Sequence, residues 1–112
     1  MLESLSLNRN EILALTELIT AIRAGWPPAR IKLFGSKTTG TFDAESDVDV
    51  LVLIPCPVSE AIRKQIVHKV FEINLAYESN ISVLILSEEE WDSSRFSFLP
   101  IHACIEKEGV AL

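Results

Sequence analysis

The sequence contains little cysteine and little glycine, and it has no excess of positive charge. Its 112 residues include two cysteines and four glycines, and ten Lys and Arg stand against sixteen Asp and Glu, so the net charge is −6. Without a Cys-x-x-Cys pair or paired histidines, a disulfide framework and a zinc site are both disfavoured. Because the few basic residues are spread along the chain, the sequence argues against a protein that binds nucleic acid by itself.

Long hydrophobic runs are also missing. No apolar run reaches the roughly 18 residues needed to span a bilayer, and segment 2–7 alternates apolar and polar residues without a cationic lead. We therefore expect a cytoplasmic protein without a membrane partner. Hydrophobic residues make up 48% of the chain, so its length and composition predict one domain, residues 1–112, with a sizeable core.

What the sequence does contain is a turn suited to phosphate. The apolar run 31–34 reads as a buried strand and ends at Gly35-Ser36. Glycine lets the backbone turn and lets a ligand approach closely. Ser36 is a good N-cap for a short helix that starts at Lys37, and the free N–H groups of a helix start suit a phosphate. We expect Gly35 and Ser36 to bind phosphate, with Lys37 as a positive group nearby.

Two carboxylates follow ten residues later. Asp47-Val48-Asp49 opens an apolar run that reaches Ile54. In a strand Asp47 and Asp49 point the same way, with Cα atoms roughly 6.5–7 Å apart. Two like charges on one face of a buried strand repel each other unless a cation joins them. The pattern predicts that Asp47 and Asp49 hold one or two Mg²⁺ (or Mn²⁺) ions and act in catalysis, because Mg²⁺ favours carboxylate and phosphate oxygens.

The stretch 31–54 resembles the signature of the DNA polymerase β-like nucleotidyltransferase superfamily, in particular its minimal nucleotidyltransferases. That signature is a strand, Gly-Ser, a short helix ending in glycine, and Ser-Asp-x-Asp on the next strand. The matching residues here are Gly35, Ser36, Gly40, Ser46, Asp47 and Asp49. The resemblance implies transfer of a nucleoside monophosphate, AMP above all, from a nucleoside triphosphate to a hydroxyl acceptor. It also implies that Ser46 belongs to the nucleotide-binding residues.

The chain departs from this family pattern at one position. Active members carry a third acidic residue on the next strand, where it helps to hold the metal and activates the attacking hydroxyl. In this chain the corresponding residue is Ser82, and no Asp or Glu lies between Asn80 and Ser87. Glu78 and Glu88 flank the strand without occupying the matching place. Loss of general-base assistance costs about 10²–10⁴ in rate.

Two alternatives to a free-standing enzyme therefore stay open. The first is an antitoxin-like protein, since minimal nucleotidyltransferases resemble the antitoxin of a pair with an all-helical HEPN-type toxin, which the antitoxin adenylylates or masks. A chain of this length leaves no room for a substrate-recognition domain, and its acidity suits a basic partner. The second is a degenerate domain with weak or no catalysis because of Ser82. A homo-oligomer is compatible with the sequence in each case.

The expected fold is a small α/β (α+β) domain, a mixed sheet of three or more strands with helices mainly on one side. Hydrophobic periodicity and capping residues predict the element boundaries. The predicted helices cover 11–24 after Asn10 as N-cap, 37–39, 60–78 after Ser59, a turn after the capping box of Ser87 and Glu90, and 98–108; the strands cover 29–34, 47–54 and 80–86. The inner stripe of helix 60–78 is Ile62, Ile66, Val70, Ile73 and Tyr77, widened by Phe71 and Leu75.

Overall fold

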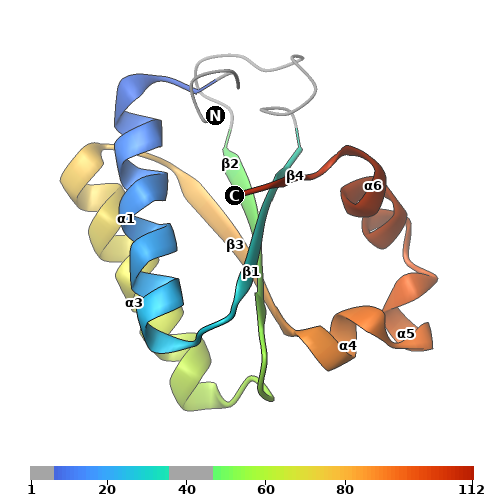
Figure 1. The fold of residues 1–112 in the computed structure, drawn as a ribbon. Helices are drawn as coiled ribbons and strands as arrows, with labels where there is room; N and C mark the ends of the chain where they lie inside the picture. Colours follow the sequence, from blue (N-terminus) through green and yellow to red (C-terminus); the bar gives the residue numbers. More distant parts are fainter. Residues whose placement is uncertain (1–6, 36–46) are drawn as a thin grey trace.

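The computed structural model describes residues 7–35 and 47–112. Its elements are α1 (Arg9–Gly25), β1 (Arg30–Phe34), β2 (Val48–Ile54), α3 (Glu60–Tyr77), β3 (Ile81–Ser87), α4 (Glu88–Asp92), α5 (Ser94–Ser97), α6 (Pro100–Glu108) and β4 (Val110–Ala111) (Figure 1). The strands and the long helices lie where the sequence predicts them. The predicted helix 37–39 and the loop after it lie outside the described residues.

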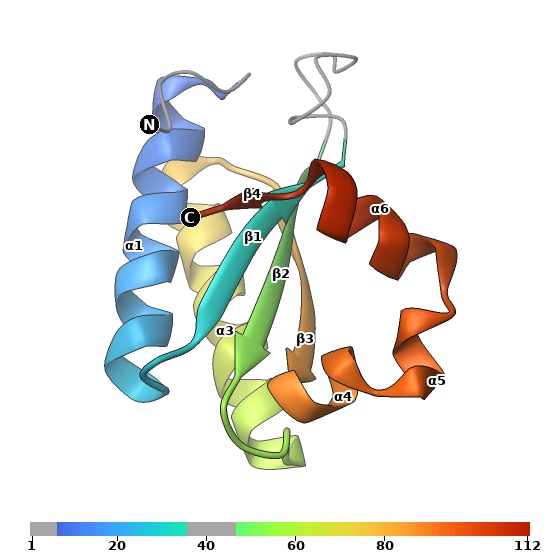
Figure 2. The same ribbon diagram turned by 45° about the vertical axis from the view of Figure 1, so that its right-hand side comes forward.

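The strands form one mixed sheet in the order β3-β2-β1-β4. β1 runs antiparallel to both β2 and β4, whereas β2 and β3 run parallel. The two longest described helices, α1 and α3, cover one face of the sheet, and the shorter α4, α5 and α6 lie on the other (Figures 1 and 2). The predicted α/β class with a mixed sheet is confirmed.

Strand β2 supplies both halves of the core. Its residues alternate between the faces, as strand geometry requires. Val48, Val50, Val52 and Ile54 join the cluster under α1 and α3, and Leu51 and Leu53 join the cluster with Trp91 and Ile105 on the other face. From Val50 to Ile54 every residue of β2 is completely buried. The strand therefore has polar side chains only at its beginning.

The start of α1 differs from the prediction. The N-cap is Asn8, not Asn10. The Asn8 Oδ1 atom accepts a hydrogen bond of 2.8 Å from the Glu11 backbone N–H, and Glu11 Oε1 accepts one of 2.9 Å from the Asn8 N–H. This reciprocal capping box satisfies two N–H groups at the helix start, which a cap at Asn10 could not do with the same glutamate.

The C-terminal part of the chain is also divided differently. The single helix predicted over 98–108 begins at Pro100, with α5 as a separate short helix before it. Proline fits the first helical position because its missing N–H has no partner there in any helix. The strand β4, which no local pattern predicted, pairs with β1 through Lys32 and Leu33.

One face of α3 contradicts the prediction. Ile66, Val70 and Ile73 are buried as expected, but Phe71 is 52% exposed and Leu75 is 69% exposed. The reason is angular. Each residue turns the helix by about 100°, and α1 and the sheet contact the row that contains Ile66. Phe71 and Leu75 therefore do not widen the core side of α3; together with Val67 they point to solvent.

The residues to which the sequence assigned no chemistry have structural surroundings. His68 is exposed and its Nε2 lies 3.1 Å from Glu72 on the same helix. The His102 ring stacks on Trp91, with ring centroids 4.2 Å apart. Cys56 and Cys104 are free thiols. Among the helices of residues 7–35 and 47–112, none is long and apolar enough to cross a membrane.

Candidate active site

The predicted site residues meet at one edge of the sheet. β1 ends at this edge, and β2 and β3 begin there, because β1 is antiparallel to β2 while β3 is parallel to it. Asp49 lies between two neighbours in the register, with Phe34 of β1 on one side and Ser82 of β3 on the other. Neighbouring strands lie about 4.8 Å apart, so this edge places residues from three segments of the chain close together.

Asp47 and Asp49 point to the same face, as the sequence predicts. That face is the one of Leu51 and Leu53, on the side of α4, α5 and α6 (Figure 1). Asp47 is exposed and Asp49 is half-buried. The pair is therefore the polar end of a strand that is otherwise buried on both faces, and it remains open to a solute from solvent.

Gly35 follows β1 directly and touches Asp49. Its φ is +83°, a conformation that residues with a side chain rarely adopt. A Cβ atom at this position would lie 2.5 Å from Asp49 Oδ2, so any other residue would push the carboxylate away. The glycine thus accommodates the carboxylate of Asp49, a role that the sequence did not indicate. The other predicted phosphate-binding residues, Ser36, Lys37 and Ser46, lie outside the described residues.

Asn80 is a residue of this site that sequence reasoning missed. Its Nδ2 atom donates a hydrogen bond to Asp47 Oδ1, and its carbonyl oxygen accepts one of 3.0 Å from the Val48 N–H. The segment around Asn80 is fixed in turn by Asn74 of α3, which donates from Nδ2 to the Ile81 carbonyl at 3.1 Å and accepts from the Ile81 N–H at 2.9 Å. Two amide side chains therefore connect α3 to the carboxylate of Asp47.

Burial and repulsion act on Asp49. Its partial burial raises the pKa of its carboxyl above the ordinary value of 3.8, and the negative charge of Asp47 raises the pKa further. Both effects disfavour the ionised form. A cation shared by the two carboxylates would reverse them, because it favours the ionised form of both.

No third carboxylate joins the pair among the residues that the structure describes. Ser82 occupies the register position beside Asp49, as the sequence predicts for the missing acid. Glu88 lies at the opposite edge of the sheet, where its Oε1 pairs with Arg30 Nε at 3.1 Å. In the described part of the chain, no three His, Cys, Asp or Glu side chains are grouped to hold a metal, so Glu78 does not complete the set either.

The donor atoms that are present fit a hard divalent cation. Mg²⁺ takes oxygen ligands and is commonly held by one or two carboxylates together with the phosphates of a substrate. Asp47 and Asp49 supply two such carboxylates on one open face, and Asp49 resists ionisation without a cation. The pair is compatible with a metal that arrives with a nucleotide, whereas a metal held by protein ligands alone would need more donors than the described residues offer.

Comparison with known proteins identifies the family. A model of the nucleotidyltransferase domain matches residues 15–103. This match covers most of the chain, so the chain belongs to the nucleotidyltransferase domain family, as the motif around Asp47 and Asp49 indicates. A search among curated proteins finds no match.

Several solved structures share the fold. A mutant of the toxin–antitoxin complex MntA–HpeT superposes with a TM-score of 0.58 at 21% identity, over 88% of this chain and 70% of that chain. A toxin–antitoxin structure with AMP-PNP gives 0.56 at 20% identity, over 85% and 69%. A second MntA–HpeT mutant, in which two aspartates two positions apart are changed to glutamate, gives 0.57 at 18% identity, over 86% and 69%. At these identities the likeness establishes the fold.

The raised pKa of Asp49 leads to a pH-dependent prediction. The folded protein holds the proton of Asp49 more tightly than the unfolded chain, so the stability contributed by this group falls as the pH rises above about 3.8 and stays low at neutral pH. Asp49→Asn should therefore raise the free energy of unfolding at pH 7 in the absence of divalent cations. The gain should vanish below about pH 3.8, as measured by urea denaturation across this range.

The matched control is Glu89→Gln, which removes an exposed carboxylate in the first turn of α4. It should give no stability gain at pH 7. A gain from Asp49→Asn that persists unchanged in acid would assign the effect to packing and would contradict the electrostatic account.

Proposed function

We propose that the chain is a metal-dependent nucleotidyltransferase that moves a nucleoside monophosphate from a nucleoside triphosphate to a hydroxyl acceptor. The observation that carries the proposal is the carboxylate pair of Asp47 and Asp49 at the open end of a buried strand, with Gly35 in contact. Such a pair costs stability in the folded protein, and binding of a metal–nucleotide complex explains its presence. Membership in the nucleotidyltransferase domain family supports the same reaction class.

Each residue has a definite task in this proposal. Asp47 and Asp49 hold Mg²⁺ or Mn²⁺, which when bound neutralises charge on the phosphates. Gly35, Ser36, Lys37 and Ser46 hold the phosphates of the nucleotide. The acceptor oxygen forms a bond to the α-phosphorus, the bond to pyrophosphate breaks, and the hydroxyl proton passes to water. Water takes this proton because Ser82, and not a carboxylate, lies beside Asp49.

The proposed nucleotide is ATP, and the group transferred is AMP. One structure with the same fold is a toxin–antitoxin with AMP-PNP, an analogue of ATP. Another carries glutamate in place of two aspartates that are two positions apart, which is the spacing of Asp47 and Asp49. These parallels support an adenine nucleotide and a functional aspartate pair in this chain.

The proposed acceptor is a hydroxyl group on a partner protein. The solved structures that share the fold are toxin–antitoxin complexes, and the net charge of −6 suits a basic partner. An all-helical HEPN-type protein is the partner that the family resemblance suggests. The second candidate function is masking of the same partner without transfer, which the absence of a carboxylate at Ser82 favours.

Label transfer tests the proposed reaction. The purified chain, incubated with α-labelled ATP, Mg²⁺ and a candidate protein acceptor, should transfer label slowly, and Asp47→Ala or Asp49→Ala should reduce transfer to background because each removes a proposed metal ligand. Calorimetry with ATP and Mg²⁺ should show binding for the wild type and weaker binding for each variant. Absence of both transfer and binding heat would contradict the proposal and favour a degenerate domain.

Ser82→Asp should increase the rate of transfer. The new carboxylate would lie in register beside Asp49, where it could accept the hydroxyl proton, and such assistance is worth up to about 10²–10⁴-fold. Ser82→Asn is the control, because it has nearly the same size without the charge. If both variants bind ATP and Mg²⁺ and transfer label at the wild-type rate, the missing carboxylate does not limit the reaction.

Partner binding can be separated from partner modification. The chain, co-expressed with the product of its neighbouring gene, should co-elute with that protein and neutralise its toxicity. Asp49→Ala should still co-elute but should not label the partner with AMP. If this variant neutralises the toxin as well as the wild type does, masking is the function; if the two proteins never co-elute, the partner proposal is wrong.

A further inference from the structure

Helix α3 carries an exposed apolar stripe on its solvent side. Val67, Phe71 and Leu75 follow each other at a spacing of four residues and are 50%, 52% and 69% exposed. Shallow grooves lie on both sides of Phe71, one lined by residues that include Lys64 and His68 and the other by residues that include Val70 and Leu75. A helix that is apolar on its core side and again on its outer side is typical of packing on both sides.

The charges of α3 are divided between its two halves. The first half, from residue 60 to 69, contains Arg63, Lys64 and Lys69 with one acidic residue, whereas the second half and the helix cap contain Glu72 and Glu78 and no Lys or Arg. A second α3 that runs in the opposite direction would place its acidic half against the basic half of the first. A parallel α3 would place like charges together.

We propose that α3 packs antiparallel against α3 of a second copy of the chain, across a two-fold axis at Phe71. In this arrangement Val67 of one copy faces Leu75 of the other. Lys64 and Glu78 lie seven residues before and after Phe71, which is two helical turns in each direction. They therefore share the side of Phe71, and Lys64 of each copy comes level with Glu78 of the other.

This contact forms a closed pair. The surface is self-complementary, so one two-fold axis satisfies both copies and leaves no apolar stripe for a third. The groove lined by Lys64, Val67 and Phe71 receives Leu75 of the second copy. Asp47 and Asp49 lie on the face of the sheet opposite α3 (Figure 2), so both candidate active sites stay open in the dimer, and this proposal does not depend on the proposed function.

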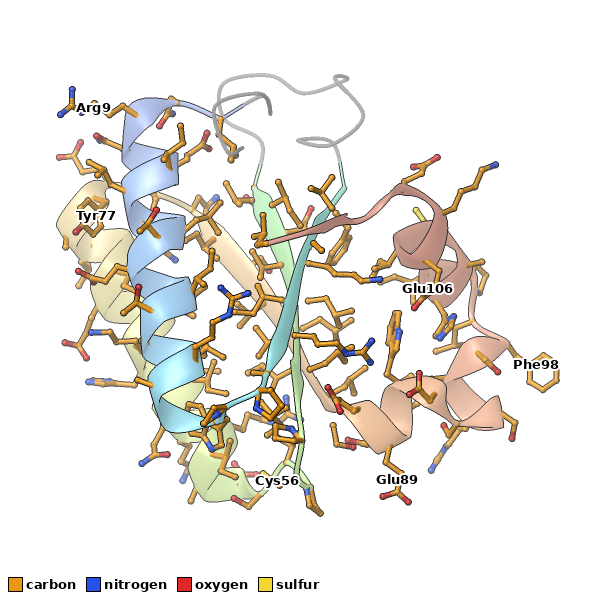
Figure 3. All side chains as sticks on the ribbon, in the orientation of Figure 1. Arg9, Cys56, Tyr77, Glu89, Phe98 and Glu106 are labelled. Atoms are coloured by element: carbon orange, nitrogen blue, oxygen red, sulfur yellow. The ribbon has the colours of Figure 1, made fainter. Side chains whose placement is uncertain are left out.

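Sedimentation equilibrium of the full chain tests the dimer. The weight-average mass should rise with concentration from 12.5 kDa towards twice that value. Phe71→Lys places two positive charges at the axis and should weaken association by about tenfold or more, as loss of a central aromatic contact does. Phe98→Lys is the matched control, because Phe98 is 86% exposed but projects from the end of α5, away from α3 (Figure 3). Far-UV circular dichroism checks that both variants remain folded.

A charge swap tests the antiparallel register. Lys64→Glu and Glu78→Lys should each weaken association by about two- to tenfold, and the double variant should restore it, because exposed ion pairs contribute little singly but exclude the reversed sign. A wild-type chain that is monomeric at every concentration, association insensitive to Phe71→Lys, or a double variant weaker than either single variant would overturn the proposal. A stripe that is covered only on addition of a different protein would overturn it as well.

Discussion

Strand β2 is buried on both faces and flanked by β1 and β3, and the rest of the arrangement depends on this constraint. A strand in this position can present polar side chains only where it enters or leaves the sheet. Asp47 and Asp49 stand at its entry. The antiparallel β1 and the parallel β3 then bring Gly35 and Asn80 to the same edge. The candidate site is therefore a result of strand order as much as of the aspartate motif.

Local pattern was enough to predict most of this. The period-two alternation of β2 and β3 fixed which residues share a face, including Asp49 with Ser82, and the apolar period of α1 and α3 fixed their extents. What failed depends on contacts between distant segments. The strand β4 exists because Val110 meets Leu33, and the exposure of Phe71 depends on which row of α3 meets α1 and the sheet. Neither is written in the local sequence.

The candidate site shows the same division. The spacing of Asp47 and Asp49 was readable from the chain, because neighbours in a strand alternate. The hydrogen bond from Asn80 to Asp47 was not, because it joins residues 33 positions apart. The same holds for Gly35, whose glycine suggested space for a ligand and whose missing Cβ also leaves space for the carboxylate of Asp49. Ser36, Lys37 and Ser46 lie outside the described residues and stay predictions.

The chain of amide contacts from Asn74 through Asn80 to Asp47 has a consequence for binding. A carboxylate that is already held in position loses little freedom when a ligand arrives, so the entropic cost of ordering is met during folding. The repulsion between Asp47 and Asp49 is likewise present before any cation binds. For the proposed site, the measured affinity for a cation would then include the release of repulsion already present in the folded protein, so two ligands could bind more tightly than two separate surface aspartates.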